Sequence, residues 1–150
     1  MRLVIDVDAT HLKCKYKAIL FVVTALDENR NIYPLTFGIG DLETDVAWEW
    51  FFTKLHFAIG DCSNLVVISD RNLSIENGLK IVCPGAARGI CFYHLKGNMK
   101  VSFMLKKQDP ILGFFVQAAK SYRLVEFNCY FSMINNERVQ AYLVSVGLHN

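Results

Sequence analysis

The first part of the chain alternates between apolar runs and polar breaks at lengths that are typical of β-strands. Residues 2–8, 17–26 and 32–39 are three such runs, and each is predicted as a strand. A polar cluster at 27–31 predicts a turn between the second and the third. Pro34 favours an edge position for the third strand, because proline cannot donate to the hydrogen-bond ladder of a sheet. Short links between the strands predict an antiparallel meander.

The spacing of apolar positions becomes helical after residue 44. Apolar residues recur at roughly helical spacing over 45–59, which predicts a helix. Thr44 or Asp45 can cap its start, and Gly60 is expected to end it. Residues 65–68 are apolar without interruption, which is typical of a strand buried on both faces of a parallel sheet. The remaining predicted elements are a helix over 73–82, a strand over 88–93, and helices over 95–106, 110–120, 123–134 and 136–146.

This order of elements predicts a mixed α/β fold, in which a three-strand antiparallel meander is followed by two parallel strands with flanking helices and a C-terminal helical segment. A helical crossover implies that the 65–68 strand is parallel to a strand of the meander. If it lies beside the first strand, Asp8 and Asp70 meet at one end of the sheet. Ligand sites in open α/β sheets lie at the carboxyl ends of strands.

Two carboxylates at the ends of adjacent parallel strands suit Mg²⁺ or Mn²⁺, which are hard cations that take oxygen ligands. A pair of such ions can stabilise both the attacking and the leaving oxygen of a phosphoryl displacement. The alternative is that Asp8 and Asp70 form turns, or that Asp70 caps the helix that follows it. Asp6 lies on the same face of the strand as Asp8 and could itself be the ligand; the other interpretations are a supporting group or a solvated residue.

The motif Cys91-x-x-His94 is a weak indication of zinc, because a structural zinc site needs four ligands. The alternative is a buried cysteine beside a histidine with a local hydrogen bond, and we expect no zinc in this chain. The net charge of +2 does not by itself indicate a nucleic-acid partner. A local basic cluster is either a solvated helix face or a surface that contacts phosphate. Its members are His94, Lys96, Lys100, Lys106 and Lys107.

Composition sets further limits. The 150 residues are 53% hydrophobic and 20% charged, which is typical of a globular protein with a buried core. No apolar run reaches the roughly 18 residues that cross a bilayer, so we expect no membrane partner. Five cysteines at irregular spacing argue against a disulfide framework and for a reducing compartment.

Several motifs resemble those of Mutator-like element (MULE) transposases, which occur in plant-type transposable elements. Residues 8–16, DATHLKCKY, are similar to the family signature DGTHLKGKY. The similarity continues in the same order over nearly the whole chain. Further matching segments are 33–38, 48–52, 68–71, 74–77, 91–98, 119–123, 126–127, 142–143 and 146–148.

The resemblance implies a ribonuclease-H-like core over 1–100, followed over 101–150 by the start of a helical insertion that we expect to be truncated. It also implies an Asp-Asp-Glu triad that binds two Mg²⁺ or Mn²⁺ ions and cuts and joins DNA. Asp8 and Asp70 match the two aspartates, and Cys91 and His94 match a C-x-x-H element of the family. Lys96 and Lys100 are candidate DNA contacts. The implied partners are transposon ends, target DNA and further copies of the chain, and the implied location is the nucleus.

Three departures from the family pattern leave the activity open. Ala9 and Cys14 replace glycines, so the local backbone geometry can differ. The third carboxylate is expected beyond residue 150; Glu126 is the best candidate within the chain, and the alternative is a surface helix residue. We therefore expect a fragment, or a degenerate or domesticated copy, that is inactive by itself. The alternative functions are a catalytically inactive regulator or assembly module and, ranked lowest, a nuclease for RNA–DNA hybrids.

Overall fold

The computed structural model describes residues 3–13, 15, 17–27, 29, 31–60 and 62–147. The chain divides into two compact units, Met1–Cys91 and Phe92–Asn150. The boundary lies after residue 91, whereas the sequence predicted it after residue 100. The difference arises because the first helix that follows the sheet, α3 (Phe92–Ser102), belongs to the helical unit.

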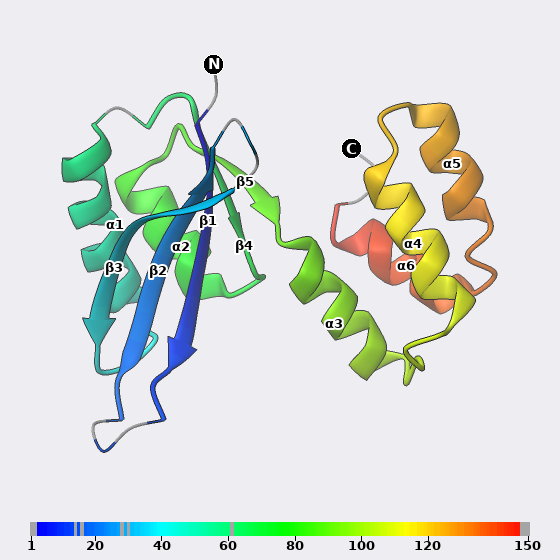
Figure 1. Ribbon diagram of the computed structural model, residues 1–150, viewed down its shortest axis with the longest axis horizontal. Coiled ribbons are helices and arrows are strands. Elements are labelled where there is room, and N and C mark those ends of the chain that lie inside the picture. Colours follow the sequence, from blue (N-terminus) through cyan, green and yellow to red (C-terminus); the bar gives the residue numbers. More distant parts are fainter. Residues whose placement is uncertain are drawn as a thin grey trace. The chain divides into compact units, whose positions relative to one another are not determined.

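The first unit contains a five-stranded mixed sheet with the order β3-β2-β1-β4-β5 (Figure 1). The first three strands form the predicted antiparallel meander, and β4 and β5 are parallel to β1 and to each other. β3 lies at the edge, as Pro34 predicted. The strands are β1 (Leu3–His11), β2 (Ile19–Leu26), β3 (Ile32–Gly40), β4 (Leu65–Ser69) and β5 (Ala87–Ile90).

Two predicted strand ends were wrong. β1 continues to His11, so Asp8 lies within the strand and pairs with Val22 of β2 instead of ending the strand. β5 ends at Ile90, because its partner β4 ends at Ser69 and the ladder stops there. The aromatic residues that follow were predicted as strand, but they begin α3.

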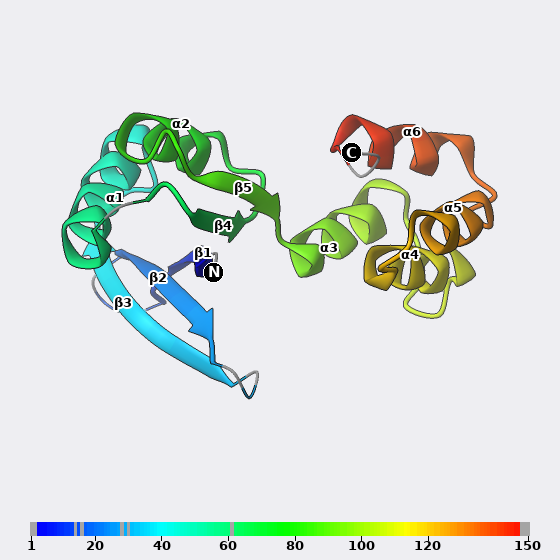
Figure 2. The same cartoon turned by 90° about the horizontal axis from the view of Figure 1, so that it is seen from above.

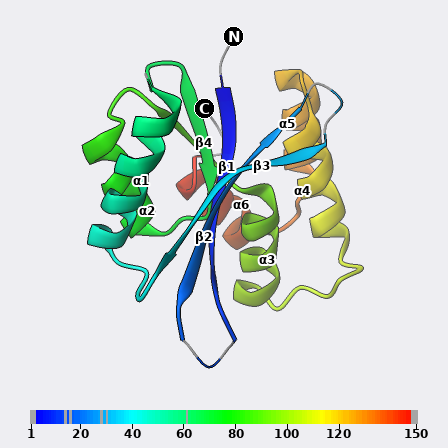
Figure 3. The same ribbon diagram turned by 60° about the vertical axis from the view of Figure 1, so that its left-hand side comes forward.

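Helices α1 (Asp45–Ile59) and α2 (Leu73–Val82) cover one face of the sheet (Figure 2 and Figure 3). Both have the predicted bounds. Thr44 caps α1, because its hydroxyl oxygen accepts the N–H of Ala47 at 3.3 Å. Gly60 ends α1 with φ 79°, a conformation that glycine adopts without steric cost.

An aromatic cluster fills the space between α1 and the sheet. Trp48 is fully buried, with its ring centroid 4.7 Å from that of Phe21 of β2 and 5.6 Å from that of Phe52. α2 approaches α1 at Gly78, where a Cβ atom would come within 3.0 Å of the backbone of Trp48 and Glu49. The absence of a side chain at Gly78 therefore lets the two helices pack closely.

The opposite face of the sheet is much more open. Phe37 of β3 is 72% exposed, and Asp6 and Asp8 of β1 are exposed on the same face. In β4 the burial alternates: Leu65, Val67 and Ser69 are buried, whereas the residues between them are only half-buried. The prediction that residues 65–68 are buried on both faces was therefore wrong for the open face.

The second unit consists of helices that follow one another after short loops. α3 begins and ends earlier than the predicted 95–106, and α4 has the predicted bounds. Phe92 and Phe115 stack in this unit with their ring centroids 5.2 Å apart. None of the helices in the described ranges combines the length and apolar character needed to span a bilayer. The other helices are α4 (Pro110–Lys120), α5 (Leu124–Ser132) and α6 (Glu137–Ser145).

Candidate functional site

The predicted aspartates lie on neighbouring parallel segments of the sheet. β1 and β4 are adjacent and parallel, and Asp6 of β1 is aligned with Ile68 of β4. Two residues further along each segment are Asp8, still within β1, and Asp70, directly after β4. Because both lie the same number of residues beyond an aligned pair, the register brings them to the same level of the sheet. The predicted adjacency of the first strand and the 65–68 strand is thus confirmed.

Asp8 projects from the open face of the sheet, because its neighbours Val7 and Ala9 point towards the helices. One of its carboxylate oxygens, Oδ1, accepts the N–H of Ala9 at 2.9 Å. Asp6 is exposed on the same face, two residues away. The open face thus presents two carboxylates on one strand. The positions of Asp6 and Asp8 are compatible with either one as the metal ligand.

Asp70 lies in a turn that polar side chains hold in place. Its Oδ1 accepts the N–H of Asn72 at 3.0 Å, and the Asn72 side chain caps α2 by accepting the N–H of Ser74 at 2.9 Å. The cap of α2 is therefore Asn72, not Asp70. Asn72 also donates its side-chain N–H to Glu43 at 2.6 Å, and Trp48 donates its indole N–H to the same Glu43 oxygen at 3.3 Å. The turn at Asp70 is thus tied to the buried core.

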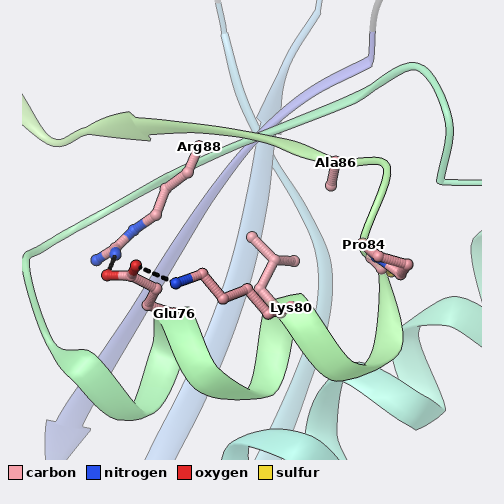
Figure 4. A pocket seen from close by; sticks show the side chains of 7 residues that line it. Glu76, Lys80, Pro84, Ala86 and Arg88 are labelled. Atoms are coloured by element: carbon pink, nitrogen blue, oxygen red, sulfur yellow. Dashed lines mark hydrogen bonds and ion pairs between the residues drawn. The ribbon is translucent and has the colours of Figure 1, made fainter.

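Arg88 of β5 holds the backbone of the same turn. Its guanidinium donates to the carbonyl oxygen of Asp70 at 2.8 Å and forms an ion pair with Glu76 of α2. Glu76 also pairs with Lys80, with a distance of 2.7 Å between Nζ and Oε1 (Figure 4). The Lys80 hydrogen bond, together with the charge of Arg88, lowers the pKa of Glu76. Glu76, Lys80 and Arg88 line a cavity of about 220 Å³ beside α2 and β5.

The chemistry of this donor set fits a hard divalent cation. Carboxylate oxygens are the ligands that Mg²⁺ and Mn²⁺ prefer, and magnesium is usually held by one or two carboxylates together with substrate phosphates. Within the described ranges, neither Asp8 nor Asp70 belongs to a group of three His, Cys, Asp or Glu residues whose ligand atoms are mutually close. Glu126 is exposed in the first turn of α5, in the helical unit, and so is not part of the sheet that carries the aspartates.

The other predicted site residues lie at the boundary between the units and beyond it. Cys91 is buried at the end of the first unit, and its N–H donates to the carbonyl of Ser69 at 2.7 Å. His94 lies in the first turn of α3, where its Nδ1 is buried and has no hydrogen-bond partner among the described residues. Lys96 and Lys100 are half-buried on α3. The roles of these four residues stay predictions.

Sequence reasoning did not find Glu43 or Arg88. Glu43 contacts Asn72, which is 29 residues away, and Arg88 contacts Asp70 across 18 residues. No periodicity or motif in the sequence marks either residue, since both act on the turn through tertiary contacts. The only available signal was local: Arg88 is a charged residue in a predicted strand.

The comparison with protein families decides the family. The sequence model of the MULE transposase domain matches residues 4–98, which is more than half of the chain. The chain belongs to the MULE transposase family. The matched range contains Asp8 and Asp70, and also Cys91 and His94. The MULE domain also has the sheet that the resemblance implied, a three-strand meander extended by two parallel strands, and the predicted ribonuclease-H-like fold is confirmed.

Two solved structures are similar to the MULE chain. The HTLV-2 integrase catalytic core domain in complex with magnesium, in its trimeric form, is 12% identical with a TM-score of 0.46, and the match covers 82% of this chain and 88% of that one. The simian T-cell lymphotropic virus intasome in complex with the PP2A regulatory subunit B56 gamma is 13% identical with a TM-score of 0.43. That match covers 90% of this chain and 49% of that one. No curated protein matches the chain.

Proposed function

We propose that this MULE transposase domain contributes to metal-dependent cleavage and transfer of DNA strands in transposition. The observation that carries the proposal is the position of Asp8 and Asp70, at the same level of two adjacent parallel strand segments. Membership of the MULE transposase family supports the same reaction class. The proposed partners are transposon ends and target DNA.

In this proposal Asp8 and Asp70 hold Mg²⁺ or Mn²⁺. Bound ions of this kind supply Lewis acidity and lower the pKa of an attacking water. The protein's own contribution is to position the carboxylates. The ladder between β1 and β2 fixes the backbone of Asp8, while Asn72 and Arg88 fix the turn that carries Asp70. Asp6 adds negative charge on the same face and is a supporting residue.

DNA binding is assigned to Lys96 and Lys100, which lie one helical turn apart on α3. Lysine contacts to phosphate release counterions, so binding should weaken steeply with salt. Changing both lysines to glutamine should weaken binding to all duplex sequences alike and make the salt dependence shallower. The proposal also includes self-association and a nuclear location, which sedimentation of the chain with DNA and imaging of a tagged copy would test.

A second candidate function is an inactive, transposase-derived regulator or assembly module that binds DNA without cutting it. It is favoured by the absence, in the described part of the chain, of a third metal-ligating residue grouped with Asp8 and Asp70. Glu126 is the candidate third carboxylate in the first proposal, although it is exposed on α5 of the helical unit. Activity of the chain is therefore the property that separates the two functions.

The metal role can be tested by isothermal titration of Mn²⁺ into the chain and into the double variant D8N/D70N. We expect the variant to lose at least about 10-fold in affinity, because an oxygen ligand without charge binds a hard divalent cation much more weakly. Circular dichroism should confirm that the variant is folded. Unchanged binding in a folded double variant would remove the metal role from these residues.

Cleavage can be tested with an end-labelled DNA duplex and an RNA–DNA hybrid of the same sequence, each with Mn²⁺. Metal-dependent nicking of DNA that disappears in D8N and in E126Q would support the first function with Glu126 as third carboxylate. Nicking that disappears in D8N alone would place the third carboxylate elsewhere. DNA binding without nicking would favour the inactive module, and preferential cleavage of the hybrid would replace transposition by a ribonuclease activity.

A further inference from the structure

A cluster of three metal-ligating side chains lies away from the aspartates. His56 is in the last turn of α1, Cys62 is in the loop between α1 and β4, and Cys83 is the C-cap residue of α2. The Nδ1 atom of His56 is 3.1 Å from Sγ of Cys62 and 3.9 Å from Sγ of Cys83. All three ligand atoms lie within 4.8 Å of one another. Residues from three separate segments thus converge on one small volume.

The distances between the nitrogen and the two sulfur atoms suit a metal ion with tetrahedral coordination. Zinc bonds of about 2.3 Å to sulfur and about 2.0–2.1 Å to nitrogen, at tetrahedral angles, place ligand nitrogen and sulfur atoms about 3.6 Å apart. The two distances from His56 Nδ1, 3.1 and 3.9 Å, lie on either side of this value. Shifts of a few tenths of an ångström would therefore bring His56 Nδ1 to the separation from each sulfur atom that a shared zinc ion requires.

We propose that His56, Cys62 and Cys83 form a binding site for a thiophilic divalent cation of the Zn²⁺ class, with the fourth position left for water or an added ligand. Two thiolates and an imidazole favour Zn²⁺ over Mg²⁺ or Mn²⁺, which prefer oxygen. The expectation of no zinc rested on the motif of Cys91 and His94, which neither Cys83 nor Cys129 completes at a recognised spacing. This site uses neither Cys91 nor His94 and is independent of the proposed strand-transfer function.

The surroundings favour a cation at this place. His56 and Cys83 lie at the C-terminal ends of α1 and α2, and the partial negative charge of both helix ends points towards the cluster. The sulfur atoms are enclosed: Cys62 is 5% and Cys83 4% exposed, whereas His56 lies at the surface. The thiols are thus enclosed at the edge of the core, whereas the imidazole is exposed to solvent.

The two thiols also interact with neighbouring groups of the protein. The Cys62 thiol donates to the carbonyl oxygen of Gly60 at a distance of 3.7 Å. Burial, together with the neighbouring Cys62, raises the pKa of the Cys83 thiol to about 12. Metal binding displaces the proton of a thiol ligand, so the affinity should rise with pH.

The cluster is separate from the aspartates. Cys62 precedes β4, and Asp70 follows it, so the two sites lie at opposite ends of this strand (Figure 1). A five-residue parallel strand is about 16 Å long. An ion at this position would link the ends of α1 and α2 to the loop that leads into β4. Its role would therefore be structural.

The test is a titration of Co²⁺, followed by competition with Zn²⁺, into the metal-free 150-residue chain under reducing conditions. We expect one Co²⁺ per chain, with a thiolate-to-cobalt charge-transfer band and the visible bands of tetrahedral cobalt. C62S, C83S and H56A should each weaken binding by at least about 100-fold, because loss even of a residue that only orients a ligand costs about 10–100-fold. Zn²⁺ should raise the melting temperature of the wild-type chain, and a chelator should reverse the increase.

Matched controls separate this site from other sites. C129S removes an exposed thiol and should leave the cobalt spectrum unchanged, as should D8N/D70N. If a cysteine variant fails to fold, alkylation of the wild-type chain answers the question: Zn²⁺ should protect Cys62 and Cys83 but not Cys129. Absence of the charge-transfer band, or equal alkylation with and without Zn²⁺, would overturn the proposal. A Cys62–Cys83 disulfide that forms in place of metal binding would also overturn it.

Discussion

The two faces of the same sheet differ in what their side chains do. On the face covered by α1 and α2, Ile5 and Val7 of β1 and Phe21 of β2 are completely buried. On the open face, the alternate residues of β1 include the exposed Asp6 and Asp8. The β-pleat sends successive side chains to opposite faces, so one strand serves both purposes. We therefore expect stability to depend mainly on the covered face and metal binding on the open one.

The largest effect on stability is expected from Trp48→Ala on the covered face. The change removes the centre of the aromatic cluster and leaves Glu43 without its indole donor, so the free energy of unfolding should fall by about 3–5 kcal/mol. Urea denaturation measures this loss. Trp50→Ala is the control on the same helix, because Trp50 is 45% exposed and should cost much less. Equal losses would mean that the covered face does not dominate stability.

Arg88→Met should have the next largest effect. It removes the ion pair with Glu76 and the hydrogen bond to the Asp70 carbonyl, and hydrogen bonds to charged groups contribute about 1.5–3 kcal/mol. Because Arg88 orients the turn and does not bind metal itself, Mn²⁺ affinity should fall less than in D70N. Lys80→Met is the control, since the Lys80 side chain is 71% exposed. Titration calorimetry measures the Mn²⁺ affinity, and urea denaturation measures the free energy of unfolding. An R88M variant that loses stability but keeps full Mn²⁺ affinity would contradict the positioning role.

Asp8→Asn on the open face should barely change stability. The substitution keeps the shape of an exposed side chain, so the free energy of unfolding should stay within about 0.5 kcal/mol. The affinity for Mn²⁺ should nevertheless fall. Asp6→Asn in parallel shows which of the two carboxylates is the ligand. A destabilised D8N with intact Mn²⁺ binding would reverse the assignment of roles to the two faces.

Glu76→Gln should affect stability only in a pH-dependent way. Lys80 and Arg88 lower the pKa of Glu76 below its ordinary value of 4.5, so ionised Glu76 stabilises the fold above that pH. The contribution is lost as the pH falls through the folded-state pKa. The wild-type chain should therefore melt higher than E76Q at pH 7, and the difference should vanish in acid. High salt should also reduce it, whereas a difference that is constant with pH would contradict the ionic cause.

The sequence predicted the architecture well where information is local. Hydrophobic spacing located the first-unit helices at their observed bounds, and Pro34 marked the edge strand. The crossover rule predicted that the 65–68 strand is parallel to a strand of the meander. Its position beside β1, on which the approach of Asp8 and Asp70 depends, was a condition that the observed pairing meets. The strand over 88–93 was extended too far because its aromatic residues favour strands. The end of β4 and the packing of Leu95 and Met99 decide instead that the chain turns helical after Cys91.

By itself, the sequence determined the order of elements, the antiparallel meander and the family, because periodicity, turn residues and motifs are encoded in short segments. Only the tertiary structure decided which residues surround the aspartates and which ones form the thiol cluster. Glu43 and Asn72 meet across 29 residues, and His56 and Cys83 across 27. Such contacts follow from how helices α1 and α2 pack on the sheet, and no local pattern carries that information.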